Sequence, residues 1–160
     1  MKTVKIDQLP WEETKSPTGK FRSECRNVSF ALGGKRDTGI WGGGHPFDLQ
    51  IRRVPPGASV CPFHAHQAQW ELFVVVSGTA TVRIGDERQV VGAGEAFLQA
   101  PGTAHQITNT GEEDFVFQVI ADNPQYDSTY YPDSKKWMVK PARKVFREAS
   151  AVDYFDGEDE

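Results

Sequence analysis

The sequence predicts an all-β protein that folds as a single barrel or sandwich. From Phe47 onward, apolar stretches of about five to eight residues alternate with turn-forming Gly, Pro, Asp and Asn, and the stretches are rich in Val, Ile, Phe and Thr. No convincing helical stripe precedes residue 135. The chain of 160 residues has the size of one domain, which leaves no room for a second barrel.

Eight short strands are expected in this part of the chain. Turn residues such as Pro55-Pro56-Gly57, Ser77-Gly78 and Pro101-Gly102 separate them. The expected ranges are 47–54, 58–66, 69–76, 79–84, 88–92, 95–99, 104–109 and 115–121. Strands of this number and length are typical of a small barrel or a two-sheet sandwich.

The segments on either side are expected to pack on this barrel rather than to form domains of their own. Residues 1–46 carry few strand signals beyond 27–32, so they are interpreted as an N-terminal arm on the core of residues 47–121. Residues 122–160 are interpreted as an extended C-terminal segment, with at most one short helix at 141–149 and a fraying acidic tail.

Composition and charge point to a small-molecule partner. A net charge of −4 and a pI near 5.6 argue against nucleic acid or an anionic membrane, since both attract an excess of Lys and Arg. The chain has neither an apolar run long enough to cross a bilayer nor an apolar leader, so the cytoplasm is the expected location. Cys25 and Cys61 lie in no CxxC pair and are expected to be free thiols.

The motifs that carry chemistry are two groups of metal-ligand residues. His64 and His66 alternate along one strand and therefore share a face, while a short turn at Gln67-Ala68 returns Glu71 on the antiparallel neighbour. Farther along the chain, the turn Pro101-Gly102 precedes His105, which is the natural fourth ligand. The spacing thus predicts a site of three imidazoles and one carboxylate.

Both motifs resemble those of the cupin superfamily. The first motif of that family, Gx5HxHx3–4Ex6G, is matched by His64, His66, Glu71 and Gly78, and the second, Gx5PxGx2Hx3N, by Gly94, Gly102, His105 and Asn109. There are two departures: six residues instead of five separate Gly57 from His64, and Ala100 replaces the first proline of the second motif. Both departures alter turns and leave the ligands in place.

The resemblance covers residues 47–121 and implies a cupin jelly-roll barrel, also called a double-stranded β-helix, that holds one divalent transition metal. It also implies a homodimer, because related cupins cover their outer sheet face with a partner. Further stretches, among them Tyr130-Tyr131-Pro132-Asp133, are similar to a group of small bacterial cupins of unassigned reaction.

The ligand set suits Fe, Mn, Ni, Zn or Cu, and ligand type does not choose among them. Four protein ligands leave two positions around an ion that prefers six, where a small molecule can chelate. Strand parity places Phe73 and Val75 on the face of Glu71, and Ile107 and Asn109 on the face of His105. These four residues are expected to wall a substrate pocket, or simply to fill the barrel core.

Two functions remain open at this point. One is a metal-dependent enzyme, a dioxygenase, decarboxylase or isomerase, that acts on a small oxygen-bearing organic molecule chelated to the ion. The other is a non-catalytic small-molecule-binding or sensor protein. No general acid or base can be named from the sequence. Gln50, Gln99 and Gln118 are candidate orienting groups, His45 is assigned to a surface loop, and Trp70 to the sheet surface or a dimer contact.

Overall fold

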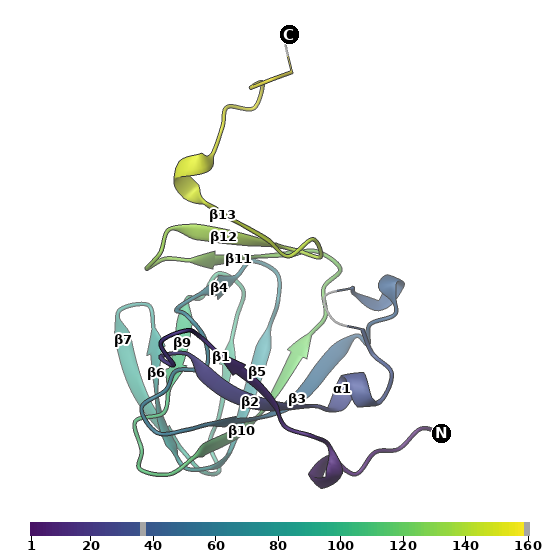
Figure 1. The fold of residues 1–160 in the computed structure, drawn as a ribbon, viewed down its shortest axis with the longest axis vertical. Coiled ribbons are helices and arrows are strands. Elements are labelled where there is room, and N and C mark those ends of the chain that lie inside the picture. The colour runs from purple at the N-terminus through teal and green to yellow at the C-terminus, as the bar shows by residue number, and fades with distance from the viewer. Residues whose placement is uncertain (36–37, 159–160) are drawn as a thin grey trace.

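The strands of this protein form three sheets that curl around a common interior (Figure 1). The computed structural model describes residues 1–35 and 38–158. The largest sheet has the order β1 (Glu12–Lys15), β2 (Arg22–Asn27), β3 (Phe47–Val54), β10 (Phe115–Asp122), β5 (Glu71–Ser77) and β8 (Ala96–Gln99). The second has the order β13 (Lys144–Arg147), β12 (Lys136–Lys140), β11 (Asp127–Tyr131) and β4 (Ala65–His66). The third has the order β7 (Glu87–Gly92), β6 (Thr79–Ile84) and β9 (His105–Thr108).

The prediction of an all-β barrel is confirmed, and most strands lie where they were expected. β3 and β6 coincide with the expected ranges, and the others differ by at most two residues at either end. The exception is the range 58–66, of which only Ala65–His66 is a strand. Before it, the chain pairs with the β9 region only at two isolated bridges, Ser59 with Thr108 and His64 with His105. Pro62 lies between these bridges and has no N–H to donate to a ladder.

The N-terminal residues pack on the barrel by becoming part of it. β1 pairs with β2, and β2 pairs with β3, so the first 27 residues add two strands to the largest sheet. The strand signal at 27–32 was wrong, because α1 (Val28–Ala31) is a single helical turn that packs against β3. Short 3₁₀ turns lie at η1 (Ile6–Gln8) and η2 (Ile40–Gly42).

The C-terminal segment is extended, as expected, but most of it is paired. β11, β12 and β13 form consecutive hairpins above the barrel, and β11 also pairs with β4 beside two of the predicted metal ligands (Figure 1). The helix considered at 141–149 was wrong, because Lys144–Arg147 pairs with the open edge of β12 and only η3 (Glu148–Ser150) is helical. Beyond η3 the chain projects away from the barrel (Figure 1), and the last two residues of the acidic tail lie outside the described part.

The hydrophobic core lies between the largest and the third sheet, at the end of the barrel away from β11 and β12. Phe115 and Phe117 are fully buried there, in a cluster that includes Val54, Val75 and Val82. The turn between β5 and β6 closes this end. Gly78 adopts φ +78° in that turn, and a side chain on it would meet the carbonyl oxygen of Asp114 at 2.6 Å, so only glycine fits. In the described residues no helix has the length and apolarity needed to cross a lipid bilayer.

Candidate metal centre

Backbone pairing brings the four predicted ligands to one place. His64 and His105 face each other across a bridge with hydrogen bonds in both directions, at 3.1 and 2.8 Å. Gly102 adopts φ +79° in the turn before β9 and donates its N–H to the carbonyl oxygen of His66 at 2.7 Å. Glu71 begins β5 on the opposite wall. The tight turn in the second motif therefore sets the separation of His66 and His105.

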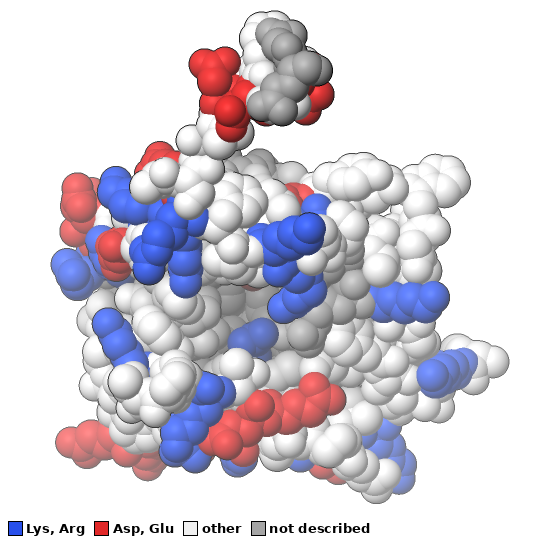
Figure 2. Space-filling view, turned by 45° about the horizontal axis from the view of Figure 1, so that its top comes forward, with Lys and Arg blue, Asp and Glu red and all other residues white. Residues whose placement is uncertain are grey.

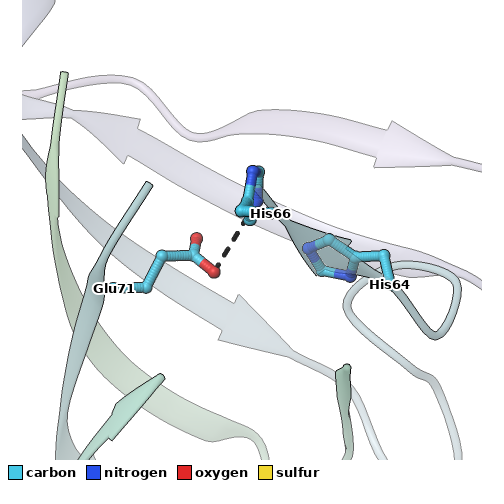
Figure 3. A group of neighbouring side chains, drawn as sticks. All are labelled: His64, His66 and Glu71. Atoms are coloured by element: carbon cyan, nitrogen blue, oxygen red, sulfur yellow. Dashed lines mark ion pairs between the residues drawn. The ribbon is translucent and has the colours of Figure 1, made fainter. Parts of the chain in front are cut away.

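The ligand-type atoms of His64, His66 and Glu71 all lie within 4.8 Å of one another (Figure 3). Glu71 Oε2 is 3.8 Å from His66 Nε2 and 3.1 Å from His105 Nε2. The ring of His64 lies 4.6 Å from that of His105 and 5.0 Å from that of His66, centroid to centroid. All three imidazoles are more than nine-tenths buried. The four residues thus converge on a single point at one end of the barrel.

Each imidazole has its Nδ1 directed at an oxygen that can only accept a hydrogen bond. His64 Nδ1 is 2.9 Å from the carbonyl oxygen of Pro62, and His105 Nδ1 is 3.1 Å from that of Thr103. His66 Nδ1 is 2.6 Å from Asp127 Oδ2. Nδ1 must therefore carry the proton in each ring, and the neutral imidazole presents the lone pair of Nε2 to the centre.

The charge state of these groups suits a cation. Burial lowers the pKa of His64, more than the opposing charge of Glu71 raises it, so this ring is neutral near pH 7. Burial alone would raise the pKa of Glu71, whereas the contact with His105 and positive charge on the three histidines lower it to about 2. Glu71 is therefore ionised when positive charge lies at this centre, on protonated rings or on a bound cation.

Glu71 Oε2 is a buried acceptor that receives no hydrogen bond from any described residue. When His105 is neutral, its Nε2 bears no proton, so the 3.1 Å contact brings two acceptors together. A buried, ionised carboxylate facing three nitrogen lone pairs is costly unless a positive charge lies between them. The donor set therefore fits a divalent transition metal held by His64, His66, Glu71 and His105.

Asp127 supports this centre, and sequence analysis missed it. Its Oδ2 accepts from His66, while its Oδ1 accepts from the backbone N–H groups of Gln67 at 3.1 Å and Ala68 at 2.9 Å. Lys140 Nζ lies 3.5 Å from Oδ2. Burial would raise the pKa of Asp127, but these hydrogen bonds and charges lower it to about 2. A carboxylate behind a metal-bound histidine is a common arrangement, yet nothing in the sequence indicates which carboxylate 61 residues away supplies it.

The centre opens into a cavity of about 460 Å³ between the inner face of the largest sheet and the second sheet. Of the four expected pocket residues, Phe73 and Ile107 line it, whereas Val75 and Asn109 do not. Val75 lies two residues beyond Phe73, and Asn109 lies two residues beyond Ile107. Both are therefore closer to the closed end of the barrel. Val75 packs in the core there, and Asn109 is fully buried and holds the carbonyl oxygens of Val54 and Glu113. These two positions are therefore corrected from pocket to core.

Other polar residues reach the cavity from both sheets. Gln50 lines it, but Gln99 and Gln118 do not, and neither His45 nor the half-exposed Trp70 is part of its wall. The residues that were not singled out as site residues include Asn27, Arg52, Cys61, Tyr131, Lys140 and Arg143. The two cysteines are free thiols, as expected. Burial raises the pKa of Cys61 to about 11, with a further contribution from Glu71, so it is a neutral thiol beside His64.

Comparisons with known proteins agree with this fold. Residues 50–121 match the sequence model of the cupin domain. An oxalate-binding protein from Thermotoga maritima is 28% identical over 42% of this chain, and the match spans only 55% of that relative's own length. Residues 50–121 therefore match a cupin domain, and the fold of the chain is a single barrel of the cupin type.

Solved structures extend the fold match beyond the cupin domain. A sugar phosphate isomerase of the cupin superfamily from Silicibacter pomeroyi has a TM-score of 0.77 at 17% identity and covers 97% of this chain and 98% of its own. A candidate sugar phosphate isomerase from Acidithiobacillus ferrooxidans has a TM-score of 0.78 at 18% identity, covering 92% and 91%. The polyketide cyclase RemF from Streptomyces resistomycificus has a TM-score of 0.60 at 23% identity, covering 78% and 80%. At these identities the likeness is one of fold.

Proposed function

We propose that this protein is a metal-dependent enzyme that isomerises a small hydroxy-carbonyl compound chelated to the ion. The observation that carries the proposal is the buried Glu71 Oε2, which receives no hydrogen bond from any described residue and lies among three imidazoles at the end of a cavity large enough for a small organic molecule. His64, His66, Glu71 and His105 would hold the ion. Bound there, a divalent ion supplies Lewis-acid polarisation of a carbonyl group.

The protein's own residues would orient the substrate and manage protons. Tyr131 lines the cavity with its ring 6.1 Å from that of His64, and burial raises the pKa of its hydroxyl, so it stays protonated near pH 7. It is the candidate proton donor to the carbonyl oxygen. Phe73, Ile107 and Phe117 form an apolar wall beside the ligands, which would exclude water from the reacting carbons.

Isomerisation is favoured over the two other reactions considered for a cupin of this kind. One proton leaves the carbon that bears the hydroxyl group and one is added to the former carbonyl carbon, while the hydroxyl oxygen loses a proton and the former carbonyl oxygen gains one. The reaction therefore balances with no oxidant and no gas released. The two sugar phosphate isomerase structures match more than nine-tenths of this chain, whereas the oxalate-binding relative matches less than half of it. The cavity is also much larger than oxalate requires.

Deuterium exchange tests the proposal. Protein loaded with Mn²⁺, Fe²⁺, Ni²⁺ or Zn²⁺ is mixed in D₂O with sugars and sugar phosphates of three to six carbons, and NMR follows the C–H next to the carbonyl group. We expect exchange with at least one compound, and its loss in Glu71→Gln.

The rival function is a non-catalytic binding protein, which would bind the same compounds without turnover. Binding to the loaded protein with neither exchange nor product, at stoichiometric protein concentration, would overturn the enzyme proposal in favour of this rival.

A further inference from the structure

We propose that the wall formed by β1, β2 and β3 contains a second subsite, built on Asn27 and Arg52, that binds a hydroxyl-bearing chain at the end of the substrate away from the metal. The inference rests on the proposed function, because it places the other end of the substrate at the metal centre. It assigns the substrate class: a polyhydroxylated molecule such as a sugar or a sugar acid, rather than a small diacid.

Asn27 carries the proposal. It ends β2, lines the cavity and is 7% exposed. Its Nδ2 donates to Glu12 Oε2 at 2.8 Å, and because a carboxylate only accepts, this contact fixes which amide atom faces Glu12. Asn27 Oδ1 is then a buried acceptor that no described residue satisfies. Such an atom costs free energy unless a ligand or water donates to it.

The usual role of an asparagine at this position does not explain Asn27. It occupies the N-cap of α1, where Asn is favoured because its side-chain oxygen accepts a backbone N–H of the first turn. Here the side chain makes no capping hydrogen bond. Glu12 holds the amide through Nδ2, which leaves Oδ1 without a donor in a residue that lines the cavity. A hydroxyl group of a ligand can supply that donor.

Arg52 supplies donors to the same region. It lies on β3, lines the cavity, and donates from Nε to Gln50 Oε1 at 3.0 Å and from Nη1 to Ser23 Oγ at 3.4 Å. Both partners are neutral, so its positive charge is held in place without an ion pair at these contacts. β2 and β3 are registered so that Asn27 lies opposite Gln50. Arg52 lies opposite Cys25, two residues away, so an acceptor and a fixed cationic donor line the same wall on adjacent strands.

The strand order sets the distance between the two ends of the cavity. Glu71 on β5 pairs with Ala121 on β10, Ala121 pairs with Asp48 on β3, and β3 pairs with β2, which carries Asn27. Three strand spacings separate β5 from β2, about 14 Å along the curved sheet. A two-carbon diacid at the metal therefore cannot extend to Asn27, whereas a longer hydroxylated chain extends farther toward it along this wall.

The charges at this end of the cavity favour hydroxyl groups over several anionic ones. Figure 2 shows a hollow with Lys and Arg above it and within it, and with a group of Asp and Glu along its lower edge, next to a further Lys or Arg. Glu12, Glu13 and Asp48 line the cavity near Asn27, and only Arg52 adds positive charge from β3. Carboxylates accept hydrogen bonds from hydroxyls and repel a second carboxylate or phosphate. This wall therefore suits a ligand with several hydroxyl groups, which can donate to the carboxylates and to Asn27 Oδ1 and accept from Arg52.

Calorimetric titration of Zn²⁺-loaded protein tests the subsite with matched probes. Glycolate carries the same 2-hydroxyacid head as the four-, five- and six-carbon aldonates D-erythronate, D-ribonate and D-gluconate, but lacks their hydroxyl chain. We expect at least one aldonate to bind at least ten-fold more tightly than glycolate. Asn27→Ala and Arg52→Gln should each reduce that advantage by about ten-fold, the usual scale of one lost hydrogen bond to a buried or charged group, and leave glycolate unchanged.

Asn123→Ala is the matched control. Asn123 is 8% exposed and also makes one Nδ2 hydrogen bond, to the carbonyl oxygen of His45, but it lies outside the cavity wall. It should leave the aldonate advantage intact. If Asn27→Ala fails to fold, Arg52→Gln alone decides.

The outcomes separate the two proposals. Glycolate binding with no aldonate advantage, or an advantage that survives both substitutions, would overturn the subsite and leave the metal centre standing. If glycolate does not bind to the loaded protein, the open coordination positions are refuted. In that case, aldonate binding that weakens in Asn27→Ala and Arg52→Gln would still support the subsite. Aldonate binding that is absent, or unaffected by both substitutions, would overturn it.

Discussion

The three histidines of the candidate metal centre are held in two different ways. His64 and His105 direct Nδ1 at the backbone carbonyl oxygen of a residue two positions earlier in the chain. His66 directs Nδ1 at the side chain of Asp127, on a strand of the C-terminal extension. Two of the candidate ligands are thus oriented by the cupin-like motifs themselves, and the third by a segment outside the part of the chain that matches the cupin domain.

This difference means that the C-terminal sheet is part of the site. Asp127 also holds the turn after β4 through the N–H groups of Gln67 and Ala68, and β11 supplies the pairing partner of β4. Lys140 on β12 adds a charge beside Asp127. The extension therefore orients His66, supports its turn and closes one side of the cavity.

Removal of a ligand side chain should have the largest effect on metal affinity. The effect should be similar for a histidine oriented by the backbone and for His66, which Asp127 orients. His66→Ala and His105→Ala each remove one of four donors, so we expect metal affinity to fall by more than about 100-fold, beyond the range seen for outer-shell substitutions. Competition with a chromophoric chelator measures it.

His45→Ala is the matched control for these two variants, because His45 lies outside the cavity wall. It should bind metal as the unchanged protein does. Equal affinity in all three variants would place the metal elsewhere.

Substitution of Asp127 should affect His66 and leave His64 and His105, which the backbone orients, unchanged. In Asp127→Asn the backbone N–H groups of Gln67 and Ala68 claim the remaining oxygen, which turns the new NH₂ group toward His66 Nδ1. His66 must then carry its proton on Nε2, and its lone pair no longer faces the centre. We expect metal affinity to fall by about 10- to 100-fold and the His66 tautomer to change in nitrogen NMR of the metal-free protein.

Thr103→Val is the matched control for that variant, because His105 uses the Thr103 carbonyl oxygen and not its side chain. Unchanged metal affinity is expected. An Asp127→Asn variant that behaves like Thr103→Val would show that the remote carboxylate has no role in metal binding.

The fold and the convergence of the four candidate ligands could be predicted because their signals are local. Alternation of apolar and polar residues and the turn residues gave the strands, and strand parity with one tight turn brought His64, His66, Glu71 and His105 together. Asp127 and Asn27 could not be predicted, because each acts through a contact that only the tertiary pairing of distant strands creates. Val75 and Asn109 show the limit of parity, which gives the face of a strand but not the depth along the barrel. The homodimer and the cytoplasmic location stay predictions.

In the metal-free protein, acid should remove the stabilisation that ionised Asp127 provides through its contact with His66. The pKa of Asp127 is about 2 in the folded protein, below its ordinary value of 3.8, so its ionised form stabilises the fold. This contribution is complete above about pH 4 and is lost as the pH falls toward 2, and it amounts to about 2 kcal/mol. Urea unfolding at pH 4.5 and 2.5 should show a smaller difference in Asp127→Asn than in the unchanged protein. The same change in unfolding free energy between pH 4.5 and 2.5 in both proteins would contradict a stabilising role for ionised Asp127.

Anomalous diffraction from crystals loaded with Zn²⁺, recorded on both sides of the zinc absorption edge, tests the central claim most directly. The account predicts one peak per chain, about 2.0–2.2 Å from the Nε2 atoms of His64, His66 and His105 and from a carboxylate oxygen of Glu71. His66 Nδ1 should remain in contact with Asp127. A peak coordinated by Nδ1 atoms, a peak away from these four residues, or no peak in a crystal soaked to saturation would contradict it.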